Sequence, residues 1–148
     1  MKKQILWMPL ILIAMFAAAA VSTSAQAAYG VRANVPFDFV VGDKTISAGR
    51  ITVRGVSPSG QGALSITNHS QGEAALRNGR RVAGAGRSQQ GKLVFHKYGN
   101  RYFLTQICTP GYEAWEVMKS KEERSLERDM RLVKNFKPES VIVAATIH

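Results

Sequence analysis

The sequence has very few of the residues that form disulfides and metal sites. Cys108 is its single cysteine and lies in an apolar run, so no internal disulfide can form. We interpret Cys108 as a small buried hydrophobic residue, with an intermolecular disulfide as the alternative. The imidazoles are those of His69, His96 and His148, and none has a metal-ligand spacing to another potential ligand. We therefore expect neither a metal nor a cofactor.

Acidic residues are also scarce, since 10 Asp and Glu stand against 20 Lys and Arg. They are too scattered to predict a paired-carboxylate site, and we interpret Glu113 and Glu116 as a solvated rim around Trp115. No Gly-x-Ser-x-Gly nucleophile motif is present. Segment 86–92 has the glycine spacing of a phosphate-binding loop, but Leu93 occupies the position that requires Ser or Thr. We predict no catalytic residue.

One uncharged, almost entirely apolar run is long, and it covers residues 5–21 after a basic start. Ala25 and Ala27 then form a small-residue cleavage site before Ala28, the arrangement of an export signal. A spanning helix is the alternative, although 17 residues is the lower limit for crossing a bilayer. We expect residues 1–27 to be a signal peptide and the only membrane segment. Residues 28–148 should form a single domain, exported to the periplasm or the extracellular space.

After removal of the signal peptide, the excess positive charge lies in the first two thirds of the chain. Residues 28–105 contain eleven basic and three acidic residues, whereas 106–148 contain seven of each. The densest basic cluster consists of Arg77, Arg80, Arg81 and Arg87 in a glycine-rich stretch. Guanidinium groups bind carboxylates and phosphates well, so we predict an anion-binding loop here, with a merely solvated loop as the alternative.

The expected partner is an anionic envelope polymer or polysaccharide, because a positive field concentrates polyanions at a surface. Specific nucleic-acid binding is not expected, since no aromatic residue lies between Arg77 and Arg87 to stack on bases.

Alternating apolar residues with turn signals between them predict a mainly β chain. Residues 35–41 should form one strand with its odd-numbered residues in the core, and 63–67 a short strand that ends at Asn68. Asn78-Gly79 should form a turn between two weak strands. Residues 112–118 should be a bridging segment.

The clearest hairpin covers residues 93–108 around Gly99-Asn100. A two-residue turn would pair Tyr98 with Arg101, His96 with Phe103 and Val94 with Thr105. The opposite face, which contains Leu93, Phe95, Tyr102, Leu104 and Cys108, should be the core side. Because the first face is also partly apolar, we expect this hairpin to be central in its sheet or covered by another layer.

A helix is predicted over about 120–134, where Ser120 and Glu123 form a capping box. Leu126, Met130 and Val133 should be its apolar stripe. The apolar run 141–147 is expected to be a buried closing strand. These patterns together predict an antiparallel barrel or sandwich of about seven or eight strands with one amphipathic helix.

Several short segments are distinctive as a set: Val35-Pro36-Phe37-Asp38-Phe39, Val41-Gly42-Asp43-Lys44, Ala48-Gly49, Thr52-Val53-Arg54, Leu93 to Gly99, Tyr102-Phe103-Leu104, Thr109-Pro110-Gly111, Ser120 and Glu123-Arg124. Together they resemble an uncharacterised family of small exported bacterial proteins. The resemblance spans nearly all of 28–148 and implies export and one mainly β domain, but no chemistry. Ser47 and Cys108 depart from the pattern at positions that concern packing.

We therefore expect a non-catalytic binding or envelope-associated module with a basic surface for anionic partners. One alternative is a small exported hydrolase that uses His69 or His96. Another is a structural, self-associating envelope protein, in which a Cys108 disulfide could link the chains.

Overall fold

The computed structural model describes residues 30–56, 62–82, 89–111, 114–133 and 136–147, so the predicted signal peptide and its cleavage site at Ala25, Ala27 and Ala28 lie outside the described residues. The described chain forms ten strands and one helix. In order these are β1 (Gly30–Val35), β2 (Phe39–Val41), β3 (Lys44–Ile46), β4 (Gly49–Gly55), β5 (Ala63–Asn68), β6 (Glu73–Val82), β7 (Gly91–Tyr98), β8 (Arg101–Cys108), β9 (Ala114–Val117), α2 (Lys121–Val133) and β10 (Glu139–Ile147).

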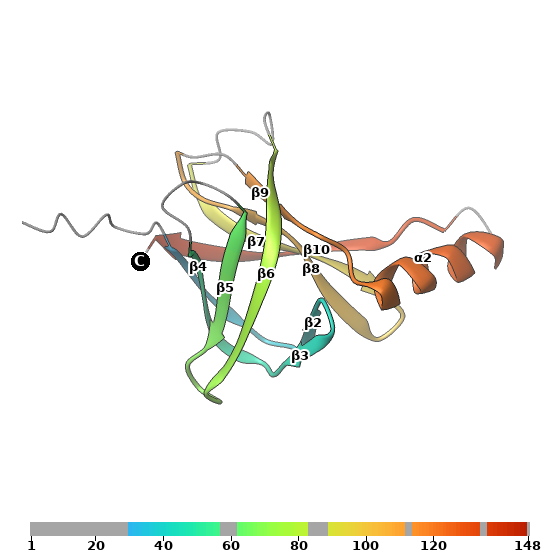
Figure 1. Cartoon of the computed structure of the whole chain (residues 1–148), viewed down its shortest axis with the longest axis horizontal. Coiled ribbons are helices and arrows are strands. Elements are labelled where there is room, and N and C mark those ends of the chain that lie inside the picture. Colours follow the sequence, from blue (N-terminus) through green and yellow to red (C-terminus); the bar gives the residue numbers. More distant parts are fainter. Residues whose placement is uncertain (1–29, 57–61, 83–88, 112–113, 134–135, 148) are drawn as a thin grey trace, which may run out of the picture.

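Eight strands form a closed antiparallel barrel (Figure 1), which confirms the mainly β prediction and selects the barrel over the sandwich. Their order is β8-β7-β10-β1-β4-β5-β6-β9, and β9 returns to pair with β8. This last seam is short, since it joins only Gln106, Ile107 and Cys108 to Glu116, Trp115 and Ala114. The segment expected to be a bridge is therefore the strand that closes the barrel.

The hairpin of β2 and β3 covers the wall where β9 does not reach. β2 runs parallel to β8, with Val40 paired to Phe103, and β3 lies near β6. Gly42 has a φ of +63° in the two-residue turn between β2 and β3, as a tight hairpin requires. The wall between β6 and β8 is therefore made by β9 in one half and by this hairpin in the other.

The barrel is filled by inward side chains of nearly every strand. The largest fully buried ones include Phe39, Phe95, Ile51 and Ile66. The expected single strand over 35–41 is wrong, because the chain leaves the sheet at Pro36, which has no amide hydrogen for a strand ladder, and starts a new strand at Phe39. Val35, Phe39 and Val41 nevertheless enter one core, as predicted.

The 93–108 hairpin is confirmed with two corrections, which concern its register and its core side, because Ile107 and not Cys108 belongs to the core cluster. Tyr98 pairs with Arg101 and His96 with Phe103, but a bulge between Val94 and Phe95 shifts the register. Val94 therefore pairs with Gln106, and the hydroxyl of Thr105 donates to the carbonyl oxygen of Val94 over 3.0 Å. The hairpin is central and is covered on its outer face, as expected.

The predicted turn at Asn78-Gly79 is wrong, because β6 continues through both residues. β6 changes its pairing here, from β5 up to Asn78 to β9 from Gly79 onward. A Cβ at Gly79 would lie 2.6 Å from Cδ1 of Leu64, so glycine serves close packing at this position.

Helix α2 starts after Ser120, whose Oγ accepts the amide hydrogen of Glu123 over 3.0 Å. Leu126 and Met130 pack on the outside of the barrel as predicted, but Val133 is 80% exposed because α2 extends beyond the barrel (Figure 1).

Strand β10 joins β1 to β7 and so completes the sheet, but it is not buried. Only Ala145 is fully buried, and Ile142 is 61% exposed, because one face of β10 looks outward from the barrel. A run of apolar residues cannot by itself separate a strand buried on both faces from one buried on a single face.

Candidate anion-binding face

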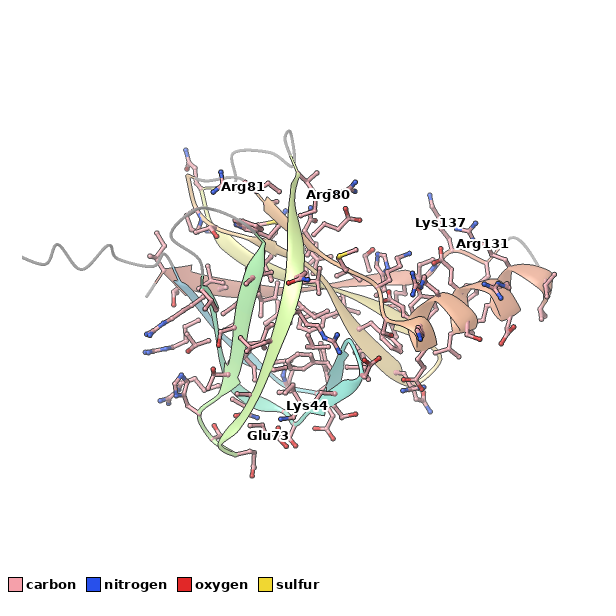
Figure 2. The ribbon with its side chains drawn as sticks, in the orientation of Figure 1. Lys44, Glu73, Arg80, Arg81, Arg131 and Lys137 are labelled. Atoms are coloured by element: carbon pink, nitrogen blue, oxygen red, sulfur yellow. The ribbon has the colours of Figure 1, made fainter. Side chains whose placement is uncertain are left out.

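The described members of the predicted arginine cluster do not share one surface. Arg77, Arg80 and Arg81 all lie on β6, while Arg87 lies outside the described residues. Arg80 and Arg81 lie near the same end of β6 on opposite sides of it (Figure 2), as neighbours on a strand must.

Arg77 joins β6 to the β2–β3 hairpin. Its Nε donates to the carbonyl oxygen of Val41 over 3.3 Å, and its Nη2 lies 3.2 Å from Oδ2 of Asp43. The guanidinium passes directly over Gly42, where a Cβ would lie 1.7 Å from Cζ of Arg77. Lys44 makes a second tie, because its Nζ donates to the carbonyl oxygen of Ala74 over 2.6 Å. Arg77 therefore holds the wall of the barrel together.

Arg80 and Arg81 contact the two neighbouring residues of β9. Arg80 Nη2 lies 2.6 Å from Oε2 of Glu116, and the Arg81 guanidinium lies 5.1 Å from the ring centroid of Trp115. Trp115 itself packs against the barrel core. We predicted that Glu113 and Glu116 form a solvated rim around this tryptophan. Glu113 lies outside the described residues, and Glu116 forms an ion pair with Arg80.

A different basic surface lies on the outer face of β1 and β4. Antiparallel pairing places Arg32 opposite Thr52, Asn34 opposite Arg50 and Gly30 opposite Arg54. We call Arg32, Arg50 and Arg54 the β1–β4 arginine face. The alternation of Arg50, Thr52 and Arg54 is visible in the sequence, but the pairing with Arg32 is not.

Strands β1, β4 and β5 contain no Asp or Glu. Arg50 and Arg54 are exposed and have no acidic partner among the described residues, whereas Arg77, Arg80 and Arg101 each have one. The charges of Arg50 and Arg54 are therefore less neutralised than those of Arg77 and Arg80.

The side chain of Arg54 lies across the neighbouring strand. A Cβ at Gly30 would lie 2.9 Å from Cγ of Arg54, so the stem of Arg54 crosses over β1. Arg50 and Arg54 are four residues apart on one strand, which separates their Cα atoms by about 13 Å. That spacing suits an extended anion with several charges better than one small ion.

His69 borders this face and has a local partner. Its Nε2 lies 3.0 Å from Oγ1 of Thr52, in the row that contains Arg32. No potential ligand group of three or more His, Cys, Asp or Glu occurs in the part of the chain that the structure describes.

His96 lies on β7, and its side chain is near Glu123 of α2. Its Nδ1 is 3.9 Å from Oε1 of Glu123, and burial, aided by the Lys119 charge and opposed by Glu127, lowers the pKa of His96. Tyr98, two residues along β7, lies on the same side of the strand and is buried too.

The remaining described acids near the barrel rim bind backbone amides. Asp38 Oδ1 accepts from the amide of Ala48 over 2.7 Å, and Glu73 Oε2 accepts from the amide of Ser47 over 2.7 Å. Asn68 completes this rim, because its Nδ2 donates to the carbonyl oxygen of Ser47 over 2.7 Å. These contacts fix the chain between β3 and β4.

Cys108 is 2% exposed at the β8–β9 seam. Burial raises the pKa of its thiol, and the charge of Lys92 opposes that rise. The thiol is therefore mostly protonated and shielded in the closed barrel.

Among the described residues, no helix has the length and apolar character needed to cross a membrane. Comparison with protein families, with curated proteins and with solved structures yields no match to this chain.

Proposed function

We propose that the protein is an exported, non-catalytic module that binds an anionic envelope polymer or polysaccharide through the β1–β4 arginine face. The observation that carries the proposal is the pair of exposed arginines on one strand face, Arg50 and Arg54, which have no acidic partner in the part of the chain that the structure describes. The export signal predicted at 1–27 and the net positive charge support the same setting.

This proposal places the anion-binding site on β1 and β4, whereas the sequence predicted it at Arg77, Arg80, Arg81 and Arg87. Arginines that already bind carboxylates must give up those contacts before they bind a ligand. Arg50 and Arg54 carry no such cost, so they should contribute more to binding than Arg77 and Arg80.

The test is retention on immobilised dextran sulfate, eluted with a salt gradient. The Arg50→Gln/Arg54→Gln variant should bind about tenfold more weakly at low salt, because two charge-assisted contacts are lost. The matched control is Arg80→Gln/Arg101→Gln, which removes the same net charge from sites paired with Glu116 and Glu122. Control retention should stay near that of the unmodified protein.

Equal loss in both variants would mean that net charge alone causes retention, and would reject the proposed face. A larger loss of retention in Arg77→Gln/Arg80→Gln than in Arg50→Gln/Arg54→Gln would mean that the anion-binding site lies on β6 and not on β1 and β4. Circular dichroism and thermal unfolding of each variant verify that the barrel is intact.

A hydrolase that uses His96 is the second candidate, favoured by one observation. Glu123 lies beside the ring, and the lowered pKa keeps His96 neutral at pH 7, the form that a general base requires. His96→Gln should then abolish turnover of ester, peptide or glycoside substrates, while His69→Gln should not. Absence of any His96-dependent turnover rejects this candidate.

Self-association through a Cys108 disulfide is the third candidate, and it requires the buried thiol to become exposed. Comparison of reducing and non-reducing gels of the native protein tests it directly.

A further inference from the structure

Buried polar atoms without a good hydrogen bond gather at one place in the described structure. Three buried side-chain polar atoms lack a hydrogen bond of good geometry among the described residues: His96 Nδ1, Tyr98 Oη and Glu123 Oε1, although Tyr98 and Glu123 interact with each other. All three lie between β7 and α2, and none belongs to the anion-binding face proposed above. Such atoms usually carry an energetic cost, so their meeting at one interface calls for a physical reason.

Glu123 is the central member of this group. It is 3% exposed and is the only fully buried residue of α2. Lys119, the cation that acts on Glu123, binds a different carboxylate, because its Nζ lies 2.7 Å from Oε2 of Glu127. Glu123 is thus left without a close counter-ion among the described residues.

The surroundings of Glu123 contain few other charges. From β7 it is faced by His96 and Tyr98, from the segment before α2 by Lys119, and from α2 itself by Glu127. Val40, Phe103 and Phe136 contribute apolar surface to the same cluster. A carboxyl group in such surroundings is more stable uncharged than charged.

Helix α2 depends on this interface. It holds 13 residues, a length at which a free helix is marginal in water, and only Leu126 and Met130 add apolar contact to the buried Glu123. A change of charge at Glu123 therefore acts on a large part of what keeps α2 docked and folded.

We infer that His96, Tyr98 and Glu123 form a proton-binding site, and that a proton bound to Glu123 keeps α2 docked against the barrel. Loss of the proton places a carboxylate in the apolar interface, and α2 detaches and unfolds while the barrel stays closed. Detachment uncovers Val40, Tyr98 and Phe103 on the outer face of the barrel.

The pH range follows from the titrations. Burial raises the pKa of Glu123 to about 7, with Lys119 opposing, so docking weakens as pH rises from 4.5 toward 7. The lowered pKa of His96 acts in the opposite sense, because docking then favours the neutral ring and strengthens as pH rises toward 6.5. The two effects oppose each other below pH 6.5, and the Glu123 effect alone remains just above it.

The test is amide hydrogen exchange of the α2 amides between pH 4.5 and 8, corrected for intrinsic exchange, with β4 amides as the barrel reference. In the unmodified protein, opening of α2 should increase as pH rises through 6.5–7 and then level off. In His96→Gln, opening should increase over the whole range from 4.5 to 7, by on the order of a hundredfold.

Glu123→Gln keeps the shape of the side chain and removes its titration. Its α2 opening should decrease with rising pH up to 6.5, since only His96 then titrates at the site. An increase of opening with pH in Glu123→Gln equal to that of the unmodified protein would overturn the inference. So would a parallel change in the β4 amides, which would mean that the whole barrel unfolds.

Discussion

The two buried regions of the protein handle polar groups in opposite ways. Inside the barrel the core is apolar, and the fully buried Asn68 at its rim donates to Ser47 and accepts from Ser70. Beneath α2, buried polar atoms of His96, Tyr98 and Glu123 lack a hydrogen bond of good geometry among the described residues. The difference indicates that the barrel stays folded whatever the charge of these groups, whereas the docking of α2 depends on the charge of Glu123.

The sharpest way to test this contrast is to remove one large side chain from each region. Phe95→Ala should lower the free energy of unfolding by about 3–5 kcal/mol, because it leaves a cavity in the barrel core. Leu126→Ala should cost about 1–2 kcal/mol, because Leu126 is only half buried. Urea unfolding followed by the fluorescence of Trp115 measures both. Similar losses would contradict the contrast.

A second prediction concerns the tie between β6 and the β2–β3 hairpin. Gly42→Ala should destabilise the barrel by more than Gly99→Ala, although both glycines have φ near +60°. A left-handed alanine costs about 1–2 kcal/mol at either site. At Gly42 the new methyl group also displaces Arg77, while nothing lies within 4 Å of a Cβ at Gly99.

Urea unfolding of these two variants and of the Arg77→Ala/Gly42→Ala double variant gives the measurement. The extra cost at Gly42 should shrink once Arg77 is absent. If it persists unchanged, Arg77 is not the obstacle.

The third prediction tests the start of α2. Ser120→Ala should destabilise the helix by about 1 kcal/mol, because the amide of Glu123 loses its acceptor. Ser125→Ala, on the exposed side of α2, is the control and should have little effect. Faster amide exchange confined to α2 is expected. Equal exchange in β4 would show that the helix and barrel unfold together.

The smallest effect at neutral pH is expected from Tyr98→Phe, since the hydroxyl makes no hydrogen bond of good geometry among the described residues. Burial, together with the charges of Glu123 and Glu127, raises the pKa of Tyr98 to about 12. The phenolate is thus disfavoured in the folded state, and stability should fall as pH rises from 10 toward 12. Tyr98→Phe should remove that part of the alkaline loss in a series of unfolding curves.

Much of the fold could be predicted from local patterns. Gly99-Asn100 fixes a two-residue hairpin, and Ser120 fixes a helix start, because each signal acts within a few residues. The register beyond Val94 could not be predicted, since the bulge depends on how β8 bends to meet both β2 and β9.

The wrong predictions share a dependence on distant residues. Asn78-Gly79 looks like a turn, but Leu64 and the strand β9 hold it extended. Val133 fits the helical stripe, yet the barrel ends before it. The apolar run 141–147 gives no indication of which of its faces meets water.

The candidate site was less predictable than the fold. Local density of arginine led to Arg77, Arg80, Arg81 and Arg87, but density does not reveal which guanidinium groups find carboxylates. The partners Asp43 and Glu116 are 34 and 36 residues away from Arg77 and Arg80. Alternation of Arg50 and Arg54 in a segment without acids was the available signal for the β1–β4 face.

Separation of the two strands at the three-residue seam between β8 and β9 can be followed by a chemical reaction. Cys108 sits at one end of that seam, with Ala114 opposite. If separation of the two strands exposes the Cys108 thiol to solvent, the rate of thiol alkylation in native buffer reports how often the strands separate. Oxidative crosslinking between molecules would then proceed no faster than the seam parts.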